Sequence, residues 1–575
     1  MGLTLGIFAF LLPLLSMSEE DGIRRVRANL QIDDPLTAVE EAGHLLENHP
    51  NSSSVAKTCI EALAAAKKEE EAFRAWDCFS FRYPHLMEDR QLLEELAWCV
   101  LKKGLESRQN GVRLASIVGT YLTHDIRAVP ILKKMMSDSN AVIRSVATQM
   151  SCTYGDAPLK EEITRLMKEE KVWMVRLQAI KAAGALKMKE LAPQLKNIVQ
   201  SEKVTYEERQ LAIEALLNIY EKISLAEWEI LAKSNRAGIR HLACCIASHF
   251  DMEEAQEGIL QLVHDPHPDV RVAALNSFGL FFRKKIPANE GLEKIKESLQ
   301  DANPAVGVTA AWAAMLIDRE VAKAPFEKWL RDPFPESRRI AAAALAASGK
   351  NGRELALSIM KEHEDPYVKA NLALGLLGQR MEVSLCCNEL YSFLEGEKRM
   401  WMWDQQLNPL FKVLSPSQVR YIDQIPNYPE AIDQMTRLNL VSLLAIVEDP
   451  RALEVLKGFL QKRSWGISGV AAATLLQEGD ETALELVRQL MDESDPNIQL
   501  QACLVLAMLG KDSAAFPILQ KAYPGSDHER KLHILEAVGR LGSMGSVPFL
   551  LTVFKEPFPV LRIVAAASLI QCLNR

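Results

Sequence analysis

The sequence of 575 residues lacks the long hydrophobic runs, the basic charge and the cysteine motifs that mark several protein classes. Its apolar N-terminal stretch, residues 1–18, is short for a transmembrane helix, so we do not expect stable membrane insertion. The formal net charge of -8 argues against a general nucleic-acid binder, which usually presents a basic surface. None of the ten cysteines forms a Cys-x-x-Cys pair, which argues against structural zinc. A local basic groove would still permit nucleic-acid or membrane-surface binding, which we keep as an alternative.

Residues 1–18 resemble the apolar core of a secretory signal, and Ser16, Met17 and Ser18 supply small residues at a candidate cleavage site. The stretch has no Lys or Arg before its apolar run, although signal peptides normally carry one. A buried or membrane-leaning first helix is the alternative. We therefore expect a periplasmic or secreted protein if the segment is a signal, and a cytoplasmic protein otherwise.

The length and composition favour an extended helical protein. A chain of 575 residues is longer than one compact core usually supports, so it forms either several domains or one repeat array. Aromatic residues make up only 6% of the chain, whereas Ala and Leu are plentiful. That mixture favours helix over sheet.

A short pattern with a basic residue recurs along most of the chain. From Arg113 to Arg271 the spacings are 31, 32, 33, 31 and 31 residues. The same slot continues, mostly at spacings of 30 to 32, with one gap of 68 residues that has room for a hidden repeat near Met400. We expect about fifteen units after residue 105. The slots are Arg113, Arg144, Arg176, Arg209, Arg240, Arg271, Gly307, Arg339, Lys369, Arg437, Ser468, Gln499, Lys531 and Arg562.

Each unit has the pattern of two helices. Pro130, Pro517 and Pro548 lie fourteen residues before a slot, and proline is tolerated in the first turn of a helix. Aspartates lie six residues before three of the slots, where they start a second helix whose face is rich in small Ala residues. These aspartates are Asp138, Asp265 and Asp301.

This arrangement resembles the HEAT repeat, in the short form found in bilin lyases and bacterial scaffolds. The resemblance implies an all-α, right-handed solenoid of stacked antiparallel helix pairs, whose second helices line a concave groove. It also implies that the Asp and Arg positions pair between adjacent repeats as a structural ladder, because a guanidinium can bridge a carboxylate and helix carbonyls. The predicted ladder residues are Asp138, Arg144, Arg176, Asp265, Arg271, Arg339 and Arg562.

Two regions depart from the repeat. Residues 19–104 lack the Arg rhythm, and their helix pairs, with Leu46-Glu-Asn-His-Pro-Asn51, are similar to tetratricopeptide repeats or capping units. Residues 381–430 hold an irregular repeat and loop between regular repeats at 105–380 and 431–575. In the irregular region Arg399, Met400, Trp401 and Trp403 are residue types enriched at protein interfaces. They are candidate partner-binding residues, and the alternative is that they fill a wide gap in the core.

We find no catalytic, cofactor-binding or metal-ligating constellation in the sequence. His264 and His267 lie in an ordinary Asp-Pro turn, and their spacing fits no zinc site. The resemblance to bilin lyases leaves an enzyme or enzyme accessory as the alternative function. We therefore predict a non-catalytic scaffold without a cofactor, which binds a protein or extended peptide in the concave groove.

Overall fold

The computed structural model describes residues 18–574 except 202, 397–400, 405–406, 509–511 and most of 418–486. Antiparallel helices make up most of the described chain, which confirms the predicted all-α solenoid. A short β-hairpin, which the sequence did not predict, is the only sheet among the described residues. Within the same residues, no helix combines the length and the apolarity needed to span a membrane. The segment 1–18 lies outside this description except for Ser18.

Backbone contacts divide the chain into two units. One unit combines residues 1–131 with residues 510–575, and the other comprises residues 132–509. The first unit is discontinuous because the C-terminal helices pack with the N-terminal ones: α32 lies against both α5 and α6. Its helices are α1 (Glu19–Gln31), α2 (Pro35–Asn48), α3 (Ser53–Ala65), α4 (Glu69–Arg82), α5 (Arg90–Gly104), α6 (Asn110–Leu122), α29 (Ala515–Ala522), α30 (His528–Leu541), α31 (Val547–Val553) and α32 (Pro559–Leu573).

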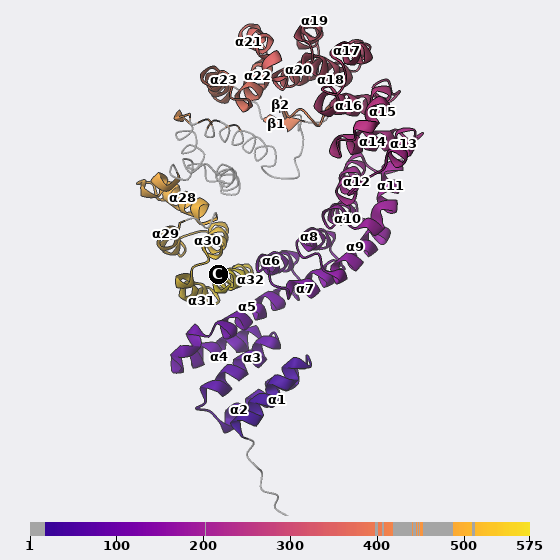
Figure 1. Ribbon diagram of the computed structural model, residues 1–575. Coiled ribbons are helices and arrows are strands. Elements are labelled where there is room, and N and C mark those ends of the chain that lie inside the picture. The colour runs from indigo at the N-terminus through magenta and orange to yellow at the C-terminus, as the bar shows by residue number, and fades with distance from the viewer. Residues whose placement is uncertain are drawn as a thin grey trace, which may run out of the picture. The chain divides into compact units, whose positions relative to one another are not determined.

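The second unit stacks helix pairs in two layers. The second helix of each pair packs on the second helix of the next, and Figure 1 shows α8 to α22 with the even-numbered helices on the inner side. Helix α7 (Ala128–Met135) crosses the boundary between the units. The inner layer contains α8 (Ala141–Ser151), α10 (Trp173–Ala185), α12 (Tyr206–Ile219), α14 (Ala237–His249), α16 (Pro268–Ser277), α18 (Pro304–Met315), α20 (Pro335–Ala346) and α22 (Pro366–Gly378). The outer layer contains α9 (Ala157–Glu169), α11 (Ala192–Gln200), α13 (Leu225–Ala232), α15 (Gln256–Leu262), α17 (Ala288–Ile295), α19 (Arg319–Leu330), α21 (Arg353–Glu362) and α23 (Val383–Gly396); α28 (Pro496–Met508) closes the unit.

Local signals start the inner helices. Asn140 caps α8 by accepting hydrogen bonds from the amides of Val142 and Ile143, and Asn303 caps α18 in the same way. Several inner helices carry proline in their first turn, where no amide partner is lost. Small residues then allow close stacking: a Cβ at Gly184 of α10 would lie only 2.6 Å from the Cα of Ala215 in α12. The Ala-rich pattern therefore sets the spacing of the layer.

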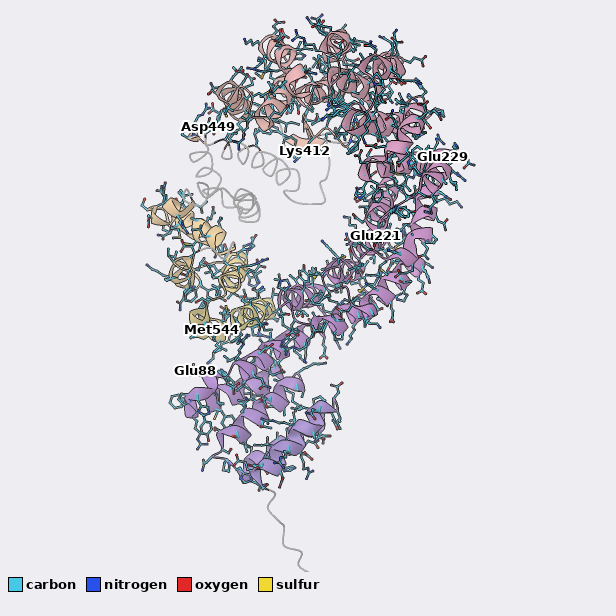
Figure 2. The ribbon with its side chains drawn as sticks, in the orientation of Figure 1. Glu88, Glu221, Glu229, Lys412, Asp449 and Met544 are labelled. Atoms are coloured by element: carbon cyan, nitrogen blue, oxygen red, sulfur yellow. The ribbon has the colours of Figure 1, made fainter. Side chains whose placement is uncertain are left out.

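The β-hairpin follows α23. Strand β1 (Trp401–Asp404) pairs antiparallel with β2 (Val413–Pro416), with Trp403 opposite Leu414. Strand β2 packs on α20 and α22, so the hairpin lies on the inner side of the helical layers (Figure 1). Figure 2 shows Lys412 of the hairpin on this inner side and Glu229 of α13 on the outer side.

Candidate functional site

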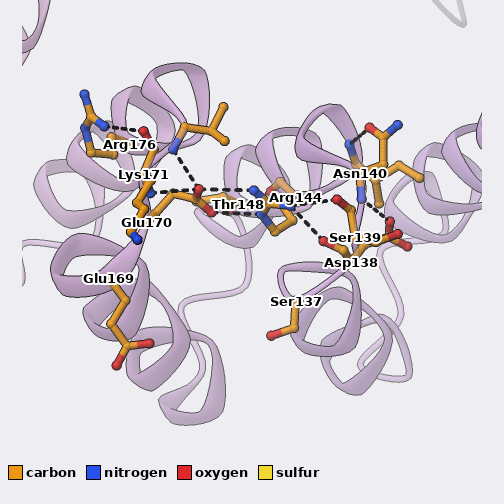
Figure 3. Close-up of polar contacts among 12 residues, drawn as sticks. Ser137, Asp138, Ser139, Asn140, Arg144, Thr148, Glu169, Glu170, Lys171 and Arg176 are labelled. Atoms are coloured by element: carbon orange, nitrogen blue, oxygen red, sulfur yellow. Dashed lines mark hydrogen bonds and ion pairs between the residues drawn. The ribbon is translucent and has the colours of Figure 1, made fainter.

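The recurring arginine of the sequence lies between adjacent helix pairs in the second unit. Arg144 of α8 donates from Nε and Nη2 to the two carboxylate oxygens of Glu170, at 2.8 and 3.1 Å, in the turn before α10 (Figure 3). Its Nη1 donates to the backbone oxygen of Asp138 at 2.9 Å. The Asp138 side chain accepts from the amide of Asn140 and so shapes the turn. One guanidinium thus joins its own turn to that of the next helix pair.

The same geometry recurs along the unit. Arg176 donates to Glu208 at 2.8 Å, and Arg271 donates to both oxygens of Asp301 at 2.9 and 3.2 Å. Asp265 accepts two bonds from Arg240 through its side chain and one from Arg271 through its backbone oxygen. Each of these three arginines also donates to a backbone oxygen five or six residues earlier.

These contacts shift the pKa values of the acidic partners. Burial raises the pKa of the Glu208 carboxyl, but hydrogen bonds from the Thr205 amide and Arg176 outweigh it and hold the pKa below its usual range. Burial also raises the pKa of the Glu170 carboxyl, but hydrogen bonds from Arg144 and the Val172 amide outweigh burial and lower that pKa. Both carboxylates are therefore ionised at neutral pH.

Near α20 the contact belongs to Arg338, although the sequence pattern selected Arg339. Arg338 donates to the backbone oxygen of Asp332 and to the carboxylate of Asp365, at 2.8 and 3.2 Å. The guanidinium of Arg339 lies over the ring of Tyr367 and 3.9 Å from Asp365. Burial lowers the pKa of Arg339. Adjacent arginines look alike in a one-residue pattern, so the spacing could not separate them.

In the first unit, the arginine at the last repeat position forms a hydrogen bond with an N-terminal helix. Arg562 of α32 donates to Glu69, the first residue of α4, at 2.7 Å, and to the backbone oxygen of Glu556 at 2.8 Å. Lys555 forms an ion pair with Asp77 at 3.1 Å. A cavity of about 620 Å³ adjoins the Arg562 pair, but the charged residues at its mouth, such as Lys67 with Glu106, largely pair with one another.

The four candidate partner-binding residues are only partly described. Arg399 and Met400 lie outside the described residues. Trp401 is completely buried and packs on Phe393 with ring centroids 4.5 Å apart, so the structure places it in the core. Trp403 is half-buried, with the Lys412 ammonium 4.5 Å from its ring centroid.

The inner helices hold the hairpin through amide side chains, which sequence reasoning did not single out. The Asn371 side chain of α22 accepts from the amide of Leu414 at 2.7 Å and donates to its backbone oxygen at 2.9 Å. Asn408, which precedes β2, pairs with Asn276 of α16 through two bonds of 3.0 Å and donates to Thr309 of α18. Asn371 was the available signal, because it is a buried asparagine in an apolar helix and a buried amide needs partners.

His267 and Cys245 of the inner layer lack the surroundings that a metal ligand and a nucleophile, respectively, need. Across the described residues, no group of three or more His, Cys, Asp or Glu could hold a metal ion. His267 instead caps α16 by accepting from the Asp269 amide. Burial raises the pKa of the Cys245 thiol to about 12, so the thiol stays protonated at neutral pH and is a poor nucleophile.

Comparisons with known proteins identify the repeat. The family model described as HEAT repeats matches residues 129–217, 256–347 and 484–570. No curated protein matches the sequence. Among solved structures, the chain is similar to Kap121p, with 10% identity and a TM-score of 0.35, over 95% of this chain and 76% of that chain. It is also similar to the Kap95:Nup1 complex, with 12% identity and a TM-score of 0.35, over 95% of this chain and 81% of that chain. A third similar structure is human deoxyhypusine hydroxylase in complex with glycerol, with 15% identity and a TM-score of 0.22, over 44% of this chain and 96% of that chain.

Proposed function

We propose that this HEAT-repeat chain is a non-catalytic scaffold that binds another protein, and that an extended segment of the partner lies on the inner layer of the second unit. One observation carries the proposal: Asn371 holds both the amide and the carbonyl of Leu414 in an extended strand. The inner layer therefore has the chemistry to bind a polypeptide backbone.

The physical reason is the hydrogen-bonding demand of an extended chain. A backbone amide and carbonyl that leave water need partners, and a carboxamide supplies one acceptor and one donor at matching positions. The helices of the layer satisfy their own backbone groups, so their side chains must provide these bonds. Asn276 and Thr309 bind the side chain of Asn408, so polar side chains of two further inner helices also contact this segment.

The recurring arginines of the inner helices, which we call the arginine column, support the stacking of the repeats and not the recognition of a partner. The guanidiniums of Arg144 and Arg271 are engaged by a carboxylate on one side and backbone oxygens on the other. Few of their donors are left for a partner. We therefore place partner recognition on the inner layer and assign the column to the spacing of the repeats.

Photo-cross-linking tests the proposal. A photoreactive phenylalanine analogue replaces Lys412, on the inner side, or Glu229, on the outer side, in the full-length protein in its native cell (Figure 2). We expect Lys412-specific adducts that mass spectrometry identifies as segments of another protein. Equal labelling from both positions, or adducts from Glu229 alone, would overturn the use of the inner layer.

A further inference from the structure

A small cavity opens beside the hairpin on the inner layer of the second unit. It has a volume of about 300 Å³ and lies between α14, α16 and the hairpin loop. Three of its lining residues, Leu280, Leu407 and Leu410, are large apolar side chains that remain 46%, 39% and 37% exposed. Water-exposed leucines gathered at one cavity are unusual, because single exposed apolar residues are normally scattered.

An irregular helix places one of these leucines. Residues Phe278–Phe282 form a single π-helical turn at the end of α16, in which Phe278 and Phe282 are completely buried. The wider turn directs Leu280, midway between them, into the cavity. π-Helical turns are rare and cost regular hydrogen bonding, and they occur frequently at functional sites.

The polar lining of the cavity does not favour a charged ligand. His241 and Cys245 come from successive turns of α14. Burial lowers the pKa of His241 and raises that of Cys245, so both are neutral at physiological pH. A buried charge would have few compensating groups here, apart from Asp269 at the rim.

We propose that this cavity receives one large aliphatic side chain, of leucine or methionine size, from the extended segment of a partner protein. The inference rests on the proposed function and specifies its partner. Continuity with the hairpin supports this occupant: Asn276, which binds Asn408 of the hairpin, also lines the cavity. A partner strand that continues along the inner layer beyond the hairpin would cross the cavity mouth. The volume lies at the lower end of the range for ligand pockets and leaves ample room for one such side chain.

Oriented peptide pools test the proposal with the full-length protein. Each pool has eleven residues with random flanks and a central Leu, Met, Ala, Lys or Asp. Burial of a leucine side chain is worth roughly tenfold or more in affinity over alanine, so we expect the Leu and Met pools to bind about tenfold more tightly than the others. The variant Leu280→Ser should remove this preference. The control Leu385→Ser, at a residue of α23 with 39% exposure that does not line the cavity, should retain it.

A second variant guards against misfolding. If circular dichroism shows that Leu280→Ser does not fold, Leu410→Ser tests the same cavity from the side of the hairpin loop. Equal binding of all pools, a preference for Lys or Asp, or a Leu preference that survives both variants would overturn the inference. In those cases Lys412-specific cross-links would leave the scaffold proposal standing, whereas their absence would overturn the proposed use of the inner layer as well.

Discussion

Removal of Arg271 should open the stack locally between α16 and α18. The guanidinium makes two bonds to Asp301 and one to the backbone oxygen of Asp265, and the ion pair is largely buried, at 17% and 15% exposure. A pair that is neither fully exposed nor fully buried should lie between the two extremes, which are about 0–1 and 3–5 kcal/mol. We expect Arg271→Met to lower the local stability by about 2 kcal/mol, and Asp301→Asn by a similar amount.

A double-mutant cycle isolates the pair. The double variant should cost less than the sum of the singles, with a coupling free energy of about 1.5 kcal/mol. Repeat arrays often do not unfold in one step, so the measurement is native-state hydrogen exchange of the α16 and α18 amides. A loss of about 2 kcal/mol corresponds to a roughly thirtyfold increase in exchange rate.

An exposed ion pair in the same region provides the control. Lys296 and Glu293 are separated by 3.2 Å, with 68% and 71% of their side chains exposed. Their cycle should give no more than about 0.5 kcal/mol, because water and salt screen such pairs. If Arg271 and Asp301 couple no more strongly than this control pair, the arginine column does not stabilise the stack.

Three further results are expected. Trp401→Ala should destabilise the hairpin region by about 3–5 kcal/mol in hydrogen exchange, whereas Trp403→Ala, at a half-buried side chain, should cost clearly less; similar costs would contradict the core assignment. The pKa of Glu208 is lower in the folded state than in the unfolded state. Its stabilisation is therefore present above the unfolded pKa of about 4.3 and is lost as pH falls through the folded pKa. In Glu208→Gln the melting temperature should depend less on pH in that acidic window, and an unchanged pH profile would refute this. Ile563→Ala, at a buried residue of α32 next to α5, should accelerate exchange in α5 and α6 as well as in α30, and an effect confined to α30 would contradict the discontinuous unit.

The sequence predicted what depends on local periodicity. The spacing of the Arg slots and the Pro positions predicted helix pairs, and the Asp six residues before a slot marked the turn before Arg271. It could not predict that α32 packs on α5 and α6, because residues separated by more than 400 positions carry no shared local pattern. The hairpin was missed for a similar reason: four-residue strands are too short for an alternating pattern, and their partners are amides on distant helices.

The hairpin lies where the arginine column is interrupted. The slot in α18 holds Gly307, which faces Trp329 so closely that a Cβ would lie 2.5 Å from the indole, and no guanidinium can join α18 to the next turn from there. The hairpin spans this step, since Asn408 binds Thr309 of α18 and β2 packs on α20 and α22. The hairpin thus contacts helices on both sides of the step at which the guanidinium is missing. The inner layer holds the extended backbone of this segment through Asn371 and Leu414, and the proposed binding of a partner rests on that contact.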